Sequence, residues 1–240
     1  MDLGITGKTA LVTAASKGLG LATAIALAEE GVKLAICARG EEALHEADAR
    51  IREAGGEVLA MPADVTEPDA PERLVLATVE RYGGLDILVA NAGGPPLGRA
   101  LDVDDDALAA ALNANLLTSV RLVRYAVPYM RAAAWGRICC ITSYGIRQPI
   151  PSLALSNVAR TALWAWAKTA AADLADENIT VNLTGPGPHD TDRVRELGGG
   201  GPMGNPVDFG RVVAFLCSEP ANWISGVALQ VDRGMTQALS

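Results

Sequence analysis

The stretch Thr13-Ala14-Ala15-Ser16-Lys17-Gly18-Leu19-Gly20 decides the fold. It joins a short apolar run, Ala10–Thr13, to an amphipathic pattern, Leu19–Glu30, which have the lengths of a strand and a helix. The two glycines allow a tight turn that brings backbone N–H groups at the helix N-terminus to a diphosphate. A glycine pair after a strand also occurs in βα turns that bind no ligand. Evidence from the rest of the chain is therefore needed to identify this turn as a diphosphate-binding site.

The whole chain repeats this alternation of short apolar runs and longer amphipathic ones. The strand-length runs are Ala10–Thr13, Lys33–Ala38, Glu57–Met61, Leu85–Ala90, Arg137–Thr142, Thr180–Thr184 and Val227–Val231. The helical patterns are Leu19–Glu30, Glu41–Ala54, Asp69–Tyr82, Asp104–Arg131, Ser152–Asp176 and Val207–Ser218. Alternating strands and helices build βαβ units, and continuously apolar strands fit a sheet buried on both faces. The sequence therefore predicts an α/β fold with one Rossmann-type, doubly wound parallel sheet of about seven strands.

Length and composition exclude several classes of protein. Half of the 240 residues are hydrophobic and only 20% are charged, which is unlike a disordered chain and fits a single domain over residues 1–240. The net charge of −8 argues against a nucleic-acid partner, which needs clustered Lys and Arg. The acidic run Asp102–Asp106 favours a helix N-terminus, so we assign it no metal.

Cysteine usage and hydropathy indicate a cytoplasmic protein. Cys37, Cys139, Cys140 and Cys217 show no C-x-x-C spacing, and we interpret them as reduced core thiols. Met1–Lys8 is short and polar, so we expect no signal peptide. No apolar run approaches the roughly 20 residues that span a bilayer, so we expect no membrane partner.

Motifs in a fixed order along the chain resemble those of a known family. Thr13–Gly20 is similar to the T-G-x-x-x-G-x-G turn of short-chain dehydrogenases/reductases, with Ala14 in place of the first glycine; we expect this departure to be mild. The other matching segments are Asp64-Val65, Asn91-Ala92-Gly93, Asn115, Ser143, and Pro186-Gly187 with Thr191. The matches extend from about Lys8 to about Gly234, and the residues of these motifs resemble those of the 3-oxoacyl-carrier-protein reductase branch.

The resemblance implies a bound dinucleotide, a small-molecule substrate and the residues that hold them. Ser143 corresponds to the family's catalytic serine and Asn115 to its active-site asparagine. The cofactor-binding residues that it implies are Thr13, Ser16, Lys17, Gly18, Leu19, Gly20, Asp64, Val65, Asn91, Ala92, Gly93, Arg160, Pro186, Gly187 and Thr191.

The end of the second predicted strand bears on which dinucleotide is used. A site selective for NAD places a carboxylate on the ribose diol about 20 residues after the glycines. Here the strand ends Cys37-Ala38-Arg39-Gly40, without an acid. Arg39 and Lys17 can face a 2′-phosphate, although solvated surface cations are common. The pattern favours NADP(H).

The sequence departs from the family at its proton-donating pair. Thirteen residues after Ser143, where the family has Tyr, stands Ser156; four residues later, where it has Lys, stands Arg160. The spacing of four keeps both on one helix face. Arg160 can keep the positive charge and the ribose hydrogen bonds, but it cannot relay a proton.

Two nearby groups are candidates for the missing acid. Tyr144 follows Ser143 directly, although a residue at a strand end equally often points into the crevice wall. His189 follows Pro186-Gly187, although a lone loop histidine is more often exposed. A water held by Ser143 and Ser156 is a third candidate.

We therefore expect an NADP-dependent oxidoreductase of carbonyl/alcohol type with an atypical active site. The alternatives are a non-redox enzyme, or a catalytically silent nucleotide-binding protein, on the same scaffold. The glycine-rich loop at about 193–206 is a short substrate lid, and Arg147 and Arg195 are candidates to receive an anionic substrate. In the family, helices equivalent to 104–131 and 152–176 pair across a twofold axis, which implies a homodimer or homotetramer.

Overall fold

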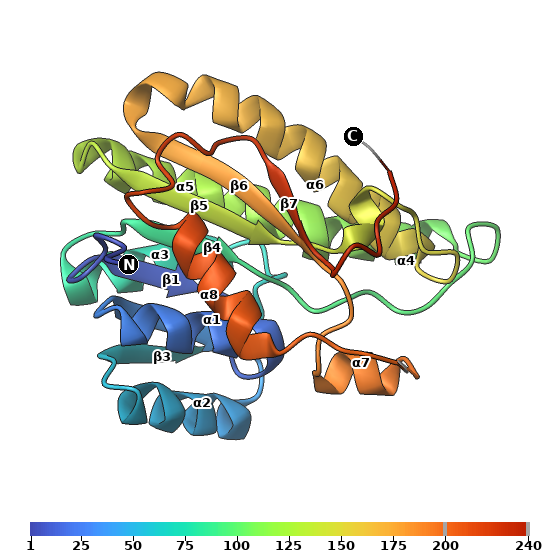
Figure 1. Cartoon of the computed structure of the whole chain (residues 1–240), viewed down its shortest axis with the longest axis horizontal. Helices are drawn as coiled ribbons and strands as arrows, with labels where there is room; N and C mark the ends of the chain where they lie inside the picture. The colour runs from blue at the N-terminus through green and yellow to red at the C-terminus, as the bar shows by residue number, and fades with distance from the viewer. Residues whose placement is uncertain (199–200, 239–240) are drawn as a thin grey trace.

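The first strand and first helix form as the sequence predicts. β1 (Thr9–Val12) is buried throughout, and α1 (Gly18–Glu29) begins at the first glycine of the turn. The computed structural model, shown in Figure 1, describes residues 1–198 and 201–238.

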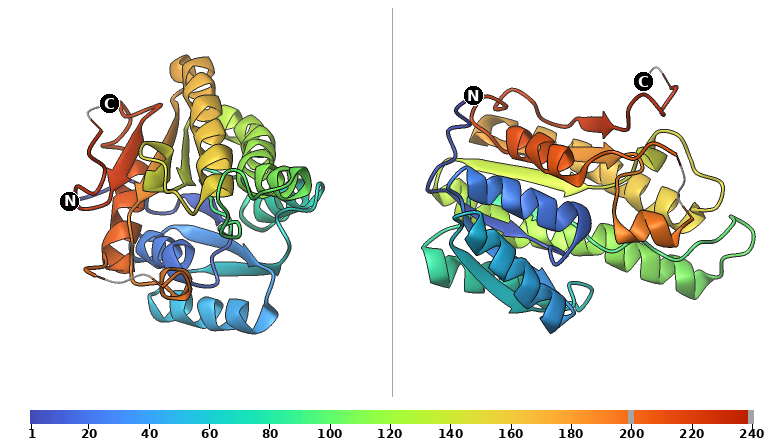
Figure 2. Two further views of the ribbon diagram at one scale, coloured as in Figure 1. Left: turned by 90° about the vertical axis from the view of Figure 1, so that its right-hand side faces the viewer. Right: turned by 60° about the horizontal axis from the view of Figure 1, so that its bottom comes forward.

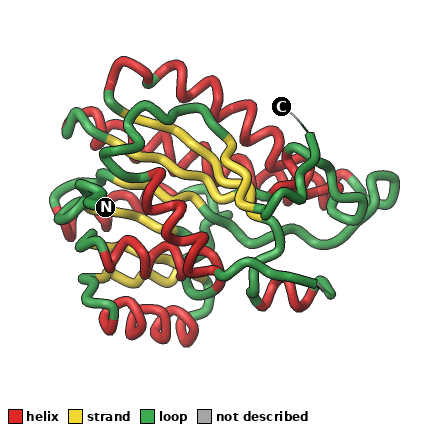
Figure 3. Tube along the Cα trace, viewed as in Figure 1, coloured by secondary structure: helices red, strands yellow, loops and turns green. Residues whose placement is uncertain are grey.

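The sheet has seven strands, all parallel, in the order β3-β2-β1-β4-β5-β6-β7. The remaining strands are β2 (Lys33–Ala38), β3 (Val58–Pro62), β4 (Ile87–Ala90), β5 (Gly136–Ile141), β6 (Ile179–Pro186) and β7 (Ala228–Val231). Figure 3 shows them as one twisted layer between helices. The order reverses between β1 and β4, so the predicted doubly wound sheet is confirmed.

Helices cover both faces of the sheet and form two hydrophobic cores (Figure 2). One face carries α1, α2 (Glu41–Glu53) and α8 (Pro206–Leu216), centred on the fully buried Phe209. The other carries α3 (Ala70–Tyr82), α5 (Thr118–Ala132) and α6 (Ala154–Asp173). In the described part of the chain, no helix combines the length and apolar character needed to cross a membrane.

The long helix predicted over Asp104–Arg131 is not a regular α-helix. It consists of α4 (Asp105–Leu112), a π-helical turn (Asn113–Leu117) and α5. The Thr118 hydroxyl donates to the Asn113 carbonyl and to the Val65 carbonyl, and the Asn113 amide donates to the Thr66 carbonyl. These bonds tie the wider turn to the segment after β3, a long-range constraint that hydrophobic periodicity does not show.

The predicted loop at 193–206 begins as a helix, which corrects our expectation. α7 (Asp192–Glu196) starts where the Thr191 hydroxyl accepts a hydrogen bond from the Val194 N–H, an N-cap. Residues 199–200, in the glycine run, lie outside the described residues.

The four cysteines are free and buried, as interpreted from the sequence. Burial raises the pKa of Cys37, Cys140 and Cys217 to about 12, and raises that of Cys139 well above its ordinary value. These thiols are therefore protonated at neutral pH and belong to the core.

The turn between β1 and α1 depends on close backbone approach. A Cβ at Gly20 would overlap the Ala14 carbonyl oxygen, so only glycine fits there. Ala14 itself has φ +48°, in the left-handed region that glycine adopts freely. The backbone at Ala14 is therefore strained. We expected alanine to be a mild replacement for the family's first glycine, but that expectation did not include a positive φ at this position.

Ala14→Gly is expected to raise the free energy of unfolding by up to about 1 kcal/mol. The left-handed conformation costs an alanine roughly 1–2 kcal/mol, and the greater freedom of glycine in the unfolded chain offsets part of this gain. Urea unfolding followed by circular dichroism measures the change. The control is Ala15→Gly, which changes a buried neighbour without a positive φ and should destabilise. If both variants lower the free energy of unfolding equally, the backbone at Ala14 is not strained.

Candidate functional site

A cleft of about 1040 Å³ opens at the carboxyl ends of the strands, beside the point where the strand order reverses. The view at the left of Figure 2 looks onto this edge of the sheet. Open α/β sheets bind their ligands at this position. Most of the residues predicted from the sequence line the cleft: Ser16, Lys17, Gly18, Leu19, Arg39, Asp64, Val65, Asn91, Ala92, Gly93, Asn115, Ser143, Tyr144, Ser156, Arg160, Pro186, Gly187, His189 and Thr191.

Thr13 and Gly20, also predicted as binding residues, act beneath the cleft surface. The buried Thr13 hydroxyl donates to the Asn91 carbonyl at 2.7 Å and accepts from the Asn91 N–H at 2.9 Å. The Asn91 side-chain amide in turn donates to the Ala14 carbonyl at 3.2 Å. These bonds join the loops after β1 and β4, so the glycine turn and the Asn91-Ala92-Gly93 segment form one rigid floor.

The loop after β6 completes the wall opposite this floor. At Gly187 there is no room for a side chain, because a Cβ would press on the backbone of Asp232. Thr191 lies against Gly18, where an added Cβ would stand 3.5 Å from the threonine methyl carbon. The segment Pro186-Gly187 with Thr191, which the family resemblance assigns to the cofactor, therefore meets the N-terminus of α1.

The two cations predicted near a 2′-phosphate both have carboxylate neighbours. The Arg39 guanidinium lies 3.9 Å from Asp64 and is 78% exposed, so the pair is loose. Lys17 lies 3.6 Å from Asp192, and both are more than half exposed. Such exposed pairs contribute little energy, so both cations can turn to a phosphate group.

Asp64 is oriented by the residue two positions later. Its carboxylate accepts hydrogen bonds from the Thr66 N–H at 2.9 Å and from the Thr66 hydroxyl at 2.8 Å. The Thr66 backbone bond, helped by the charge of Arg39, lowers the pKa of Asp64. Because Thr66 is itself held by Asn113, the π-helical turn positions this edge of the cleft.

Ser143 stands at the end of β5 in extended conformation. Its hydroxyl accepts a hydrogen bond from the Gly145 N–H at 3.1 Å, as the N-cap of a one-turn 3₁₀-helix, Tyr144–Ile146. The hydroxyl hydrogen remains available for a substrate oxygen. Ser156 is buried on α6 and lines the same cleft, so the fold brings the two predicted serines to one cavity.

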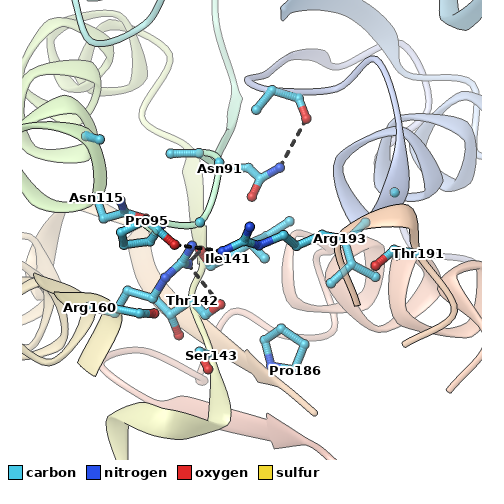
Figure 4. A pocket seen from close by; sticks show the side chains of 18 of the residues that line it. Asn91, Pro95, Asn115, Ile141, Thr142, Ser143, Arg160, Pro186, Thr191 and Arg193 are labelled. Atoms are coloured by element: carbon cyan, nitrogen blue, oxygen red, sulfur yellow. Dashed lines mark hydrogen bonds between the residues drawn. The ribbon is translucent and has the colours of Figure 1, made fainter. Parts of the chain in front are cut away.

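Arg160 is buried and holds the end of the strand that carries Ser143. One terminal nitrogen of its guanidinium donates to the carbonyls of Ile141 and Thr142, at 2.9 Å each (Figure 4). Burial, and next the positive charge of Arg193, lower the pKa of Arg160 to about 10, which leaves it a cation at neutral pH. The tether to β5 is a role that the sequence did not predict.

Asn115 lies inside the π-helical turn and is 3% exposed. Both polar atoms of its side chain are buried without a hydrogen-bond partner among the described residues. A buried amide without partners is costly, so its place on the cleft wall indicates that water or a ligand bonds to it.

The two candidate proton donors differ in their surroundings. Tyr144 is half-buried on the cleft wall, next to Ser143. His189 is 5% exposed, so the expectation of an exposed loop histidine was wrong. Its Nδ1 lies 2.9 Å from the Gly187 carbonyl and must donate to it, and its ring packs edge-on against Phe209 at 5.2 Å. These contacts give His189 a structural role.

The arginines expected to receive an anionic substrate have other partners. Arg147 stacks on Trp164 and donates to the Ala228 carbonyl. Arg195 is paired with Asp190 and Asp192. A third arginine, Arg193, lines the cleft together with Arg39 and Arg160, and sequence reasoning missed it. The signal available was its position two residues after Thr191.

Comparisons with known proteins agree with this geometry. A family model described as Enoyl-(Acyl carrier protein) reductase matches residues 13–236. Dehydrogenase/reductase SDR family member 4 from Sus scrofa is 33% identical, over 97% of this chain and 88% of the relative.

Solved structures share the whole fold. L-sorbose reductase from Gluconobacter frateurii, complexed with NADPH and L-sorbose, is 33% identical, with a TM-score of 0.93 and full coverage of both chains. A 7α-hydroxysteroid dehydrogenase complexed with NADH and 7-oxo glycochenodeoxycholic acid is 27% identical, with a TM-score of 0.92 over 100% of this chain and 98% of the other. Since the family model and a 33% identical relative both extend over nearly the whole sequence, the chain belongs to the short-chain dehydrogenase/reductase family.

Proposed function

We propose that the protein is an NADP-dependent oxidoreductase that transfers a hydride between nicotinamide and a carbonyl or alcohol substrate. The observation that carries the proposal is that the glycine turn, Ser143 and Asn115 meet in one cleft at the carboxyl ends of the strands. A dinucleotide cradle supplies the hydride of a carbonyl reduction, and a hydroxyl donor beside it can stabilise the charge that develops on the substrate oxygen. The relative solved with NADPH and a sugar has the same fold and supports this assignment.

The residues of the cleft fit a dinucleotide along its full length. The N-terminus of α1 at Gly18 can receive the diphosphate, Val65 and Asp64 the adenine, and Thr191 the carboxamide. Glycine at position 20 leaves the backbone room for this approach. When bound, NADP(H) supplies the hydride that the reaction exchanges.

The surroundings of Arg39 support NADP(H) over NAD(H). Relatives with this fold have been solved with NADPH and with NADH, so the fold alone does not choose between them. At the end of β2 a cation, not a carboxylate, faces the cleft, and Lys17 adds a second positive charge from the glycine turn. A 2′-phosphate gains from both charges, whereas a ribose diol lacks its usual acceptor.

The substrate carbonyl would be polarised by Ser143. Its hydroxyl is held by Gly145 and stands at the end of β5, which Arg160 fixes in place. Asn115 would hold a water behind the reacting oxygen, because its amide has no protein partner among the described residues. This division of roles needs no proton from Arg160.

The proton is the unusual part of this proposal. An aliphatic hydroxyl such as Ser156 has a pKa far above neutral pH, and a single guanidinium does not close that gap. Tyr144 is the first candidate for the acid, because it lines the cleft beside Ser143. A water held by Ser143 and Ser156 is the second, and His189 the third, because its Nδ1 is already engaged.

Two other functions remain on the same scaffold: a non-redox enzyme that binds the nucleotide structurally, and a silent nucleotide-binding protein. The exchanged pair at Ser156 and Arg160 is the observation that favours them. Loss of NADPH absorbance that depends on a carbonyl substrate separates the proposed function from both. Substrate conversion without cofactor turnover identifies the non-redox enzyme.

We also propose that the protein assembles as a homodimer or homotetramer through α4–α5 and α6. Val158 on α6 is 50% exposed and Leu117, at the end of the π-helical turn, is 41% exposed. Both lie on the helices that pair across a twofold axis in the family, and closed symmetric assemblies are the commonest oligomers.

NADPH is expected to bind at least tenfold more tightly than NADH. Arg39→Asp should narrow or reverse this difference, because it replaces a partner of the 2′-phosphate with an acceptor for the ribose diol. Titration calorimetry measures both affinities. Arg50→Asp, an identical charge change on the outer face of α2, is the control and should leave the ratio unchanged. Equal affinities in the unaltered protein would contradict NADP selectivity.

Ser143→Ala is expected to lower kcat by about 10²-fold or more through lost stabilisation of the substrate oxygen. Ser156→Ala should cost less than about tenfold, because a hydroxyl of such high pKa contributes little as an acid. NADPH oxidation with a carbonyl substrate measures both, and calorimetry checks that cofactor affinity is kept. Complete loss of turnover in Ser156→Ala with intact affinity would instead identify Ser156 as the proton donor.

Light scattering at micromolar concentration should give about two or four times the 24.8 kDa mass of one chain. Val158→Glu should lower that mass, because it places a charge in the proposed interface. The matched control is Leu76→Glu on α3, 48% exposed and outside the proposed interface, which should leave the mass unchanged. A mass near that of one chain for the unaltered protein contradicts the assembly.

A further inference from the structure

Two guanidinium groups converge inside the cleft from opposite walls. Arg160 extends from α6, and Arg193 extends from α7 across the cleft to the loop after β4 (Figure 4). There Arg193 donates to the Pro95 carbonyl at 2.7 Å, and its guanidinium approaches Gly94 so closely that a Cβ there would stand 3.2 Å from Nε. The charge of Arg193 is close enough to help lower the pKa of Arg160.

Neither arginine has a protein counter-charge. Within residues 1–198 and 201–238, Arg160 and Arg193 form no ion pair, and their hydrogen bonds go to neutral backbone carbonyls. The two acidic residues that line the cleft have other partners. Asp64 is bonded to Thr66 and lies near Arg39, and Asp192 is paired with Lys17 and Arg195.

Two positive charges that are partly removed from water repel each other, and a bound anion would compensate for this repulsion. A carboxylate suits this place, because its two oxygens can accept from the planar donors of two guanidinium groups. The unpartnered amide of Asn115, 3% exposed on the wall of the same cleft, offers a further donor.

We propose that Arg160 and Arg193 form a subsite for the carboxylate of the substrate, so that the protein acts on oxo acids or the corresponding hydroxy acids. Ser143 lines the same cleft, so a molecule whose carboxylate is held by the two arginines can present its carbonyl to the polarising hydroxyl. The cofactor diphosphate, the other anion that enters this cleft, has its own donors at the N-terminus of α1. This assignment of substrate class rests on the proposed hydride transfer.

The test is calorimetric binding to the NADP⁺-loaded protein, which needs no turnover. The probes are 2-oxopentanoate and 4-oxopentanoate, each compared with its methyl ester, which keeps the carbonyl but lacks the charge. At least one acid should bind ten times more tightly than its ester. Arg193→Gln should abolish that preference, and Arg193→Lys should keep part of it.

Arg195→Gln is the matched control, because this exposed residue of α7 is paired with Asp190 and Asp192 and lies outside the cleft lining. It should retain the preference for the acid. The proposal is overturned if neither acid binds more tightly than its ester, or if the preference survives in Arg193→Gln. It is also overturned if Arg193→Gln weakens NADP⁺ as much as it weakens the acid, because the anion is then the cofactor phosphate.

The same samples separate this inference from the proposed function. Acid binding that depends on Arg193, without NADPH oxidation by that acid, supports the subsite and contradicts hydride transfer. Oxidation of NADPH by acid and ester alike, with equal affinities, supports hydride transfer and overturns the subsite.

Discussion

All seven strands run in the same direction, so their carboxyl ends share one edge of the sheet, and the loops that form the cleft depend on this constraint. The glycine turn follows β1, Asn91 follows β4, and Ser143 follows β5. Because the strand order reverses between β1 and β4, the loops after these two strands leave toward opposite faces and open the space that a ligand enters. The bonds between Thr13 and Asn91 keep the two loops from separating further.

The sheet, most of the helices and the cradle could be predicted because they follow from local pattern. The short apolar runs in the sequence identified the strands. Gly18, Gly20 and Ser143 could be placed because each follows the end of a strand by a few residues. The parts that could not be predicted depend on contacts between distant segments. The π-helical turn needs the loop after β3, and the burial of His189 needs Phe209 from α8. Arg193 was missed because no periodicity tells how far a side chain on a five-residue helix extends.

Arg160, at the position where the family resemblance predicts a lysine, has a structural role that its charge alone does not suggest. A guanidinium carries several donors in one plane, and here one nitrogen already binds two strand-end carbonyls. The strand that carries Ser143 is thereby fixed by a side chain from α6. Unlike a lysine, an arginine at this position stays protonated and cannot relay a proton. In the proposed reaction Arg160 therefore contributes rigidity and charge, and the substrate oxygen takes its proton from another group of the cleft.

The burial of the four thiols has a practical consequence for following the molecule in solution. With a pKa of about 12, a buried cysteine is a thiolate in only about one molecule in 10⁵ at pH 7, and the thiolate is the form that attacks an alkylating reagent. Cys139 and Cys217 belong to the core on one face of the sheet, and Cys37 and Cys140 belong to the core on the other face, so the cysteines report on both cores. The rate at which each cysteine is labelled therefore measures how often that part opens, without any added probe.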